Sequence, residues 1–294
     1  RDLYKQDSNC HAEHSEASAK KGTVQSVSRF PLESYVTEIP AGIPVQEIPL
    51  EEVLPHFDWR MFYAIWGVKY GSASPEAMEL MQLRRDAEDE LAVADFKIML
   101  SAKFFPASAN RANEICFTAD GKTHKWPMMR QEGDKNMSLC DFVAPESSDK
   151  KSAFGMFAIC VHKRSKAHEH GCCCPACSNA YEDMIGKAVR MTLAEAASLW
   201  LNKAINSGSK IIKPAIGYSS CPDHTLKGEV LEILDGSVMH AGPLGIQLTE
   251  SYAMTPEASI CGLIFMHPEA VYPQIRRISQ QQYDNYVERR GMDA

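Results

Sequence analysis

Cysteine and histidine gather in one short stretch of the sequence, which reads His168-Glu169-His170-Gly171-Cys172-Cys173-Cys174-Pro175-Ala176-Cys177. Its Cys-x-x-Cys spacing and soft ligands could hold a tetrahedral Zn²⁺ or an iron–sulfur cluster. The candidate metal ligands are His170, Cys172, Cys174 and Cys177. A second correctly spaced Cys-x-x-Cys is missing, although other residues could complete a site, namely Cys160, Cys10, His11 or His14. The alternatives are a reduced surface loop or an opportunistic redox pair.

Other residue types with possible chemistry are spread along the chain. Asp58 lies between two aromatic residues, and a second group is found in the run Lys213-Pro214-Ala215-Ile216-Gly217-Tyr218. Taken singly, these residues favour structural roles. An Asp before an apolar segment is typical of a helix cap, and a Gly near a Pro is typical of a turn. Tyr218 and Tyr272, taken alone, are typical of partly buried structural tyrosines.

Composition excludes several classes of protein. The 294 residues carry a formal net charge of -7, with 45% hydrophobic and 23% charged residues, as in ordinary soluble domains. A net negative charge argues against a general binder of nucleic acid, which needs clustered Lys and Arg. The longest apolar run, from Ile260 to Met266, is far shorter than the ~18 residues of a membrane span. No membrane contact is expected, and without an export signal we expect a cytoplasmic protein with reduced thiols.

These residues need a framework of helices and strands, and the patterns predict one domain. Residues 1–38 are polar and predict a flexible leader, and residues 39–294 predict a single domain with the Cys/His-rich insert at 162–178. The periodicity predicts helices over residues 50–54, 74–100, 181–206, 223–235 and 279–290. Strands are predicted over residues 102–105, 114–118, 122–126, 142–144, 154–161, 247–248 and 259–265. Because these elements do not alternate, the order predicts an α+β fold with a mainly antiparallel central sheet flanked by long helices.

Many short motifs follow one another in a fixed order. They are Phe57-Asp58-Trp59, Asp141-Phe142-Val143-Ala144-Pro145, Lys213–Tyr218, Cys221-Pro222-Asp223-His224-Thr225, Leu248-Thr249-Glu250-Ser251, Ala253-Met254, Ala258-Ser259, His267-Pro268 and Arg289-Arg290-Gly291-Met292. Over roughly residues 40–294, this order resembles the activation (reactivation) domain of cobalamin-dependent methionine synthase. The resemblance implies a C-shaped single domain built round an antiparallel sheet.

The resemblance also implies a function. Members of that family bind S-adenosylmethionine and present its methyl group to a corrinoid that flavodoxin or a similar reductase has reduced. It assigns Asp58 to the ligand's ammonium group and Lys213 to its carboxylate. It also assigns four further contacts, at Ala215, Gly217, Tyr218 and Tyr272. No catalytic side chain is expected, because the sulfonium methyl is already activated and the protein has only to position it.

The sequence departs from the family pattern at several positions. Lys213 stands where the family normally has arginine, and lysine offers a point charge instead of a two-pronged fork. Pro273 replaces a second tyrosine, and Met191 replaces the first carboxylate of a pair, which leaves Glu195 alone. An Asn202-Lys203 pair replaces a His-Glu pair, and only residues 207–212 remain of a long insert. These changes lie toward the corrinoid side of the family's site.

The chain contains no Asp-x-His-x-x-Gly, the corrinoid-binding signature. Any cobalamin is therefore expected on a separate protein or on a portion of chain not present here, as for a stand-alone activator of a split methionine synthase. Two other functions stay open. One is a degenerate scaffold that docks a corrinoid protein or flavodoxin without methyl transfer. The other is a metal or redox sensor that uses the Cys174-x-x-Cys177 loop.

Overall fold

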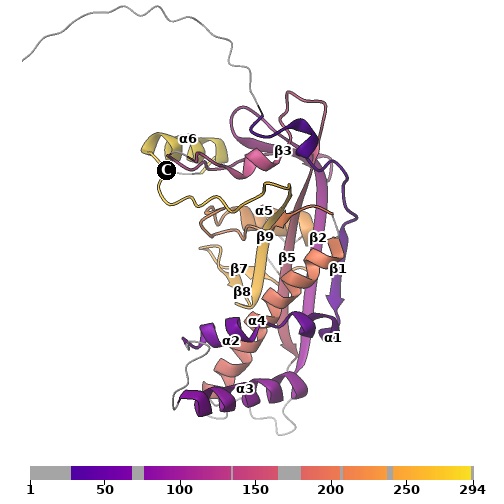
Figure 1. Cartoon of the computed structure of the whole chain (residues 1–294), viewed down its shortest axis with the longest axis vertical. Helices are drawn as coiled ribbons and strands as arrows, with labels where there is room; N and C mark the ends of the chain where they lie inside the picture. Colours follow the sequence, from indigo (N-terminus) through magenta and orange to yellow (C-terminus); the bar gives the residue numbers. More distant parts are fainter. Residues whose placement is uncertain are drawn as a thin grey trace, which may run out of the picture.

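A seven-stranded antiparallel sheet forms the centre of the molecule in the computed structural model, which describes residues 28–67, 76–133, 135–164, 180–205, 208–236 and 241–292 (Figure 1). The strand order is β4–β3–β2–β5–β9–β6, and β1 also pairs with β2. The sheet strands are β1 (Ile43–Ile48), β2 (Asp95–Ala109), β3 (Glu114–Ala119), β4 (Lys122–Pro127), β5 (Ser152–Arg164), β6 (Ile211–Ile212) and β9 (Ser259–Met266). A separate two-stranded sheet joins β7 (Gln247–Leu248) to β8 (Met254–Thr255). The predicted α+β class with a mainly antiparallel sheet is confirmed.

Helices cover both faces of this sheet. The α-helices are α1 (Leu50–Val53), α2 (Trp59–Ile65), α3 (Glu76–Val93), α4 (Ala180–Ile205), α5 (Leu226–Asp235) and α6 (Gln280–Arg290), and the 3-10 helices are η1 (Leu32–Ser34), η2 (Leu54–His56) and η3 (Leu139–Phe142). Buried residues of α1 to α4 pack on one face, and those of α5 and η3 pack on the other. In Figure 1, α6 and α3 project from opposite ends of the long strands toward the same side, so that the ribbon traces a C.

The sequence of strand β5 is almost entirely apolar because the strand lies between two cores. Phe154 and Met156 enter the core beneath α5, whereas Phe157 and Ile159 enter the core beneath α4. Both faces of the strand are therefore buried, and neither set of alternating positions can be polar. The prediction of a central strand here is confirmed.

Two predicted elements were wrong. The predicted helix at 74–100 ends at Val93, and residues 95–100 belong to β2, which pairs with β5 from Asp95↔Arg164 to Ala107↔Ser152. Alternating burial at Phe96, Ile98 and Leu100 fits a strand, and the long pairing outweighs local helix propensity. No strand forms at 142–144: Phe142 ends η3, which a capping box of Ser138 and Asp141 begins, and residues 143 and 144 follow it without regular structure.

The start of the domain also differs from the prediction. Residues 28–38 were placed in the flexible leader, but Tyr35 is only 5% exposed and Phe30 packs against the core. Residues 1–27 of that leader and residues 165–178 of the predicted insert lie outside the described residues. No helix of the described residues is long and apolar enough to cross a membrane.

His267 fastens this N-terminal segment to the sheet. Its fully buried ring packs at a tilt against Phe30 (centroids 4.6 Å apart) and edge-on against Tyr35 (5.0 Å). Its Nδ1 accepts from the Glu269 amide (3.1 Å) and its Nε2 lies 2.9 Å from the Ser34 hydroxyl. Burial lowers the pKa of this imidazole, although Glu269 opposes the shift. The neutral form is therefore the one that the fold requires.

We expect His267 to make the protein less stable in acid. Below about pH 6.5 the unfolded chain protonates this histidine and the folded chain does not, so the free energy of unfolding falls by up to ~1.4 kcal/mol per pH unit until the folded pKa is reached. Urea unfolding of the wild type and of His267→Gln between pH 7 and 5 measures the effect. The variant should show a shallower dependence on pH, and parallel curves would contradict the assignment.

Candidate functional site

Four of the predicted site residues lie on one loop, which follows the edge strand β6. The loop runs from Lys213 to Ser219 and is fixed to β9, because Ala215 forms a bridge to Gly262 and the Ile216 amide donates to Cys261 O (2.9 Å). The fifth, Tyr272, joins the loop from a distant segment. Its hydroxyl accepts from the Lys213 amide (3.0 Å).

The loop is clamped to the segment that carries Tyr272. The Ile275 amide donates to Ser219 O (2.8 Å), and the Ser219 hydroxyl donates to Gln274 Oε1 (2.7 Å). Tyr218 and Tyr272 nevertheless remain 72% and 49% exposed. Two large aromatic rings are thus held at the surface on a rigid frame, which is how aromatic side chains are presented to a ligand. The expectation that they are partly buried structural residues does not hold for Tyr218.

Lys213 turns its side chain inward. Its ammonium donates to the Ser198 carbonyl on α4 and lies 5.6 Å from the centre of the Phe157 ring. Burial lowers the pKa of Lys213 to about 8, although Glu195 favours the charged form. Burial in turn raises the pKa of Glu195, which Lys213 opposes. The only carboxylate left of the family's pair is therefore electrostatically coupled to the cation of the loop.

Asp58 lies on a different element. It is exposed and caps α2, where its Oδ1 accepts from the Arg60 amide (2.9 Å), as the cap prediction requires. Helix α2 packs on α4, the same helix that Lys213 contacts through Ser198. The acidic residue Asp58 and the basic residue Lys213 are therefore both connected to α4, Asp58 through α2 and Lys213 through Ser198.

Gly217 is the tightest point of the loop. Its φ is +96°, a conformation that side chains disfavour, and its amide donates to Cys221 O (2.7 Å). A Cβ at this position would lie 2.4 Å from the His224 ring. The ring of His224 in turn contacts Lys227, whose side chain is buried on α5. Sequence reasoning missed Lys227, because a lone lysine at a helix start predicts only a solvated residue.

A buried ionic network joins α6 to the segment that precedes α5. Asp223 accepts from Thr225, from the Tyr286 hydroxyl (2.8 Å) and from Arg290 (3.0 Å), and Arg290 also pairs with Glu229 (2.6 Å). Burial alone would raise the pKa of Asp223, but these hydrogen bonds and the Arg290 charge hold it below its usual value. Helix α5 itself begins at Leu226 and not at Asp223 as predicted, because Asp223 is engaged in this network.

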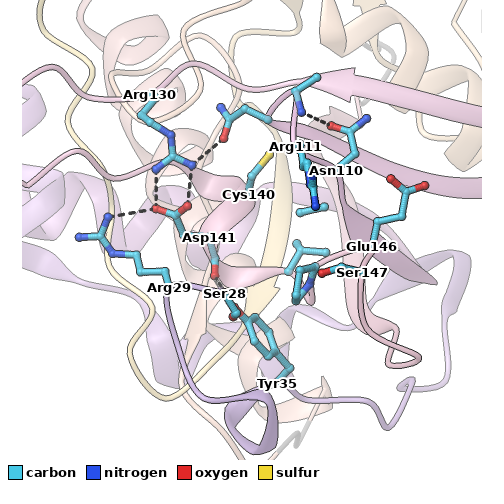
Figure 2. Close-up of a pocket in the computed structure, with 15 residues that line it drawn as sticks. Ser28, Arg29, Tyr35, Asn110, Arg111, Arg130, Cys140, Asp141, Glu146 and Ser147 are labelled. Atoms are coloured by element: carbon cyan, nitrogen blue, oxygen red, sulfur yellow. Dashed lines mark hydrogen bonds and ion pairs between the residues drawn. The ribbon is translucent and has the colours of Figure 1, made fainter. Parts of the chain in front are cut away.

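Two cavities have linings that contain no residue of the loop from Lys213 to Ser219. One, of about 630 Å³, is lined by Arg29, Asn110, Arg111, Arg130 and Asp141 among others (Figure 2). Arg130 forms a bidentate pair with Asp141 (2.6 and 2.9 Å), which also accepts from Arg29 (3.4 Å), so one carboxylate is shared by two guanidinium groups. The other cavity, of about 660 Å³, includes Tyr252 and Arg290. Neither lining contains a predicted ligand residue.

The predicted metal ligands His170, Cys172, Cys174 and Cys177 lie outside the described residues. Within the described ranges, no group of three or more His, Cys, Asp or Glu side chains is arranged to hold a metal ion. The cysteines Cys116, Cys140, Cys160, Cys221 and Cys261 are free thiols. Burial raises the pKa of Cys160 to about 11 and those of Cys221 and Cys261 to about 12, so these thiols are unreactive.

Comparison with known proteins gives a consistent result. The family model described as vitamin B12 dependent methionine synthase, activation domain, matches residues 49–291. Among solved structures, the chain is similar to a crystal structure of the MetH reactivation domain bound to AdoHcy, with a TM-score of 0.72 and 27% sequence identity. That alignment covers 90% of this chain and 91% of that chain.

Proposed function

Because the chain belongs to the family of activation domains of vitamin B12-dependent methionine synthases, we propose that it binds S-adenosylmethionine and positions the methyl group for transfer to a corrinoid held elsewhere. The observation that carries the proposal is the clamped loop, which places Tyr218 and Tyr272 at the surface beside a glycine of positive φ. The AdoHcy bound to the similar MetH domain supports the same ligand class.

The proposed roles follow from the chemistry of each group. The ligand's amino-acid end carries one ammonium and one carboxylate, which suit the Asp58 carboxylate and the Lys213 ammonium. Ala215 and Gly217 have little or no side chain, so the ligand can approach the loop backbone closely. The exposed faces of Tyr218 and Tyr272 can pack against the ligand and attract its sulfonium charge.

This arrangement needs no general base or nucleophile from the chain. When a partner's corrinoid is bound, its reduced cobalt supplies the nucleophile that accepts the methyl group. The residues of this chain then contribute by orienting the sulfonium and by shielding it from water. A corrinoid-carrying methionine synthase portion and a reductase such as flavodoxin are the partners that this function requires.

Ligand titrations test the proposal directly. We expect S-adenosylmethionine and AdoHcy to bind and to raise the Tm of the wild type, as a ligand of the native state does. Asp58→Asn and Lys213→Met should each weaken binding by roughly 10- to 100-fold, the effect of losing a hydrogen bond to a charged group. Lys213→Arg should bind more tightly than the wild type, because its guanidinium forks around a carboxylate. Isothermal titration calorimetry measures all three.

Matched controls come from the exposed surface. Asp95 and Lys187 belong to exposed ion pairs, and Asp95→Asn and Lys187→Met should leave the affinity unchanged. Absence of binding by the wild type at millimolar ligand would refute the function. Binding that survives unchanged in Asp58→Asn and Lys213→Met would instead refute the assigned roles.

A scaffold function without methyl transfer is the second candidate. The inward-turned ammonium of Lys213, together with Met191 and Pro273 at family positions, favours it. A labelled methyl group of S-adenosylmethionine, incubated with this chain, a reductant and a corrinoid protein, distinguishes the two. Label that reaches the corrinoid fraction excludes the scaffold, and binding without transfer of label supports it.

A further inference from the structure

Lys227 is a buried lysine whose identified partners are both neutral. It lies in the first turn of α5 with 4% of its surface exposed. Its ammonium donates to the Tyr252 carbonyl (2.9 Å) and lies 2.9 Å from Nδ1 of His224. Burying an ammonium without a carboxylate is costly, so an apolar side chain of similar length would serve the core at least as well. Stability of the core therefore gives no reason for a lysine at this position.

The contact with Lys227 fixes the state of the His224 ring. An ammonium group can only donate, so Nδ1 of His224 must accept, and the single ring proton of the neutral imidazole is placed on Nε2. His224 is exposed, and its ring can exchange protons with solvent. Burial and the Lys227 charge lower the pKa of His224, and Asp223 opposes them.

The same ring also lies against the ligand loop, through Cε1 and the two ring nitrogens. An added Cβ on Gly217 would approach Cε1 to 2.4 Å, Nδ1 to 2.8 Å and Nε2 to 2.9 Å. The imidazole thus occupies the space that a side chain at position 217 would need, and the loop backbone rests on it. A chain of direct contacts runs from the turn at Tyr252 through Lys227 and His224 to Gly217.

We propose that Lys227 and His224 are positioning residues for the ligand: the ammonium holds a neutral imidazole against Gly217, and the imidazole sets the path of the loop that binds S-adenosylmethionine. The inference rests on the proposed function. It assigns to the Cys221–Thr225 motif a role in the ligand site, and it makes ligand affinity dependent on the protonation of His224.

The charges around the ring give the direction of that dependence. Adding a proton to Nδ1 removes the acceptor for Lys227 and places two cations 2.9 Å apart. Asp223, the neighbouring acid, is engaged by Arg290, and on the loop side the ring lies against the uncharged Gly217. Cys261 of β9, which faces Lys227, is a neutral thiol because burial raises its pKa to about 12. Lys227 therefore repels a protonated His224 from its position against Gly217, and ligand affinity falls as the pH falls.

Titration of AdoHcy into the full chain at pH 7 and pH 5.5 tests this. For the wild type we expect weaker binding at pH 5.5, by less than about tenfold, because the pKa of His224 is lowered and part of the imidazole stays neutral at that pH. Lys227→Met should weaken binding by about tenfold at pH 7, the effect of losing one hydrogen bond to a charged group, while its Tm stays equal to or above that of the wild type. In that variant the acid-side loss should largely disappear, because no ammonium group is left to repel the protonated ring. A role in folding alone would lower Tm and leave the pH profile in place.

His224→Asn is the conservative variant. Its amide oxygen can accept from Lys227 and does not titrate, so binding should persist and become independent of pH between 7 and 5.5. If wild type and Lys227→Met bind equally at pH 7 with the same pH profile, the inference is wrong and the proposed function stands. If the wild type does not bind at pH 7, both are wrong. Independently of ligand, ¹⁵N chemical shifts of His224 should show the Nε2–H tautomer, and an Nδ1–H tautomer would contradict the inference.

Discussion

Asp223→Ala is expected to lower the free energy of unfolding by about 3 kcal/mol, the lower end of the range for breaking a buried ion pair from one side, because Arg290 keeps its pair with Glu229. The side chains of Asp223 and Arg290 are only 4% and 9% exposed, so the guanidinium loses a carboxylate that water cannot replace. The Tyr286 hydroxyl and the Thr225 amide lose their acceptor at the same time. The fall in Tm should be roughly 2–4 °C for each kcal/mol. Urea unfolding and thermal unfolding both measure it.

Asp95→Ala is the matched control for this change. Asp95 pairs with Arg164 at 3.2 Å, but both side chains are 48% exposed, and an exposed pair contributes at most about 1 kcal/mol. Equal effects of the two substitutions would contradict the account of the buried network. Because Asp223 connects α6 to the segment that carries His224, its loss should also weaken ligand binding. Without ligand, Asp223→Ala should still be less stable to unfolding than Asp95→Ala.

The fold could be predicted where burial leaves a simple pattern. Strand β5 is buried on both faces and reads as an unbroken apolar run, and α4 ends where residues 207 and 208 combine Ser and Gly. Residues 94–100 mislead because Ala94 and Ile98 continue the apolar spacing of α3, and only pairing with β5 makes residues 95–100 a strand. Such pairing joins segments about 60 residues apart, which local periodicity cannot represent.

The site divides in a similar way. The motif around Gly217 marks the loop, since a glycine beside proline predicts an unusual backbone, and the structure gives it a φ of +96°. The resemblance also placed Tyr272 in the site, and the structure joins its hydroxyl to the Lys213 amide of the loop. Lys227 and Arg290 could not be found from sequence, because each acquires its role from burial by distant segments. A lysine or arginine on a helix surface and one in a core have the same local sequence.

The loop itself has little regular structure, so its path depends on its supports. The supports are β9 on one side, the Tyr272–Ile275 segment on another, and the His224 ring beneath Gly217. Each support is a direct contact of neutral groups or backbone atoms, which can be displaced at modest cost. Ligand affinity should therefore respond more strongly than stability to changes at these points.

Gly217→Ala is expected to weaken AdoHcy binding by about 100-fold. A side chain at positive φ costs about 1–2 kcal/mol, and the new Cβ would lie 2.4 Å from the His224 ring. The free protein can relieve both by shifting the loop, but the ligand requires the original path. Binding must then restore the strain, and about 3 kcal/mol of restored strain corresponds to a loss of about 100-fold. Calorimetric titration of the variant at pH 7 gives the value.

Gly236→Ala separates the contact with the ring from the cost of the backbone. Gly236 has a φ of +77° at the end of α5, and an added Cβ there meets nothing within 4 Å. It should lower Tm slightly and leave the affinity for AdoHcy unchanged. The loss from His224→Ala to the double variant Gly217→Ala, His224→Ala should be smaller than the loss from wild type to Gly217→Ala, because the ring that the Cβ strikes is gone and only the backbone cost of the positive φ remains. Additive losses in the double variant would show that the strain at Gly217 does not act through His224.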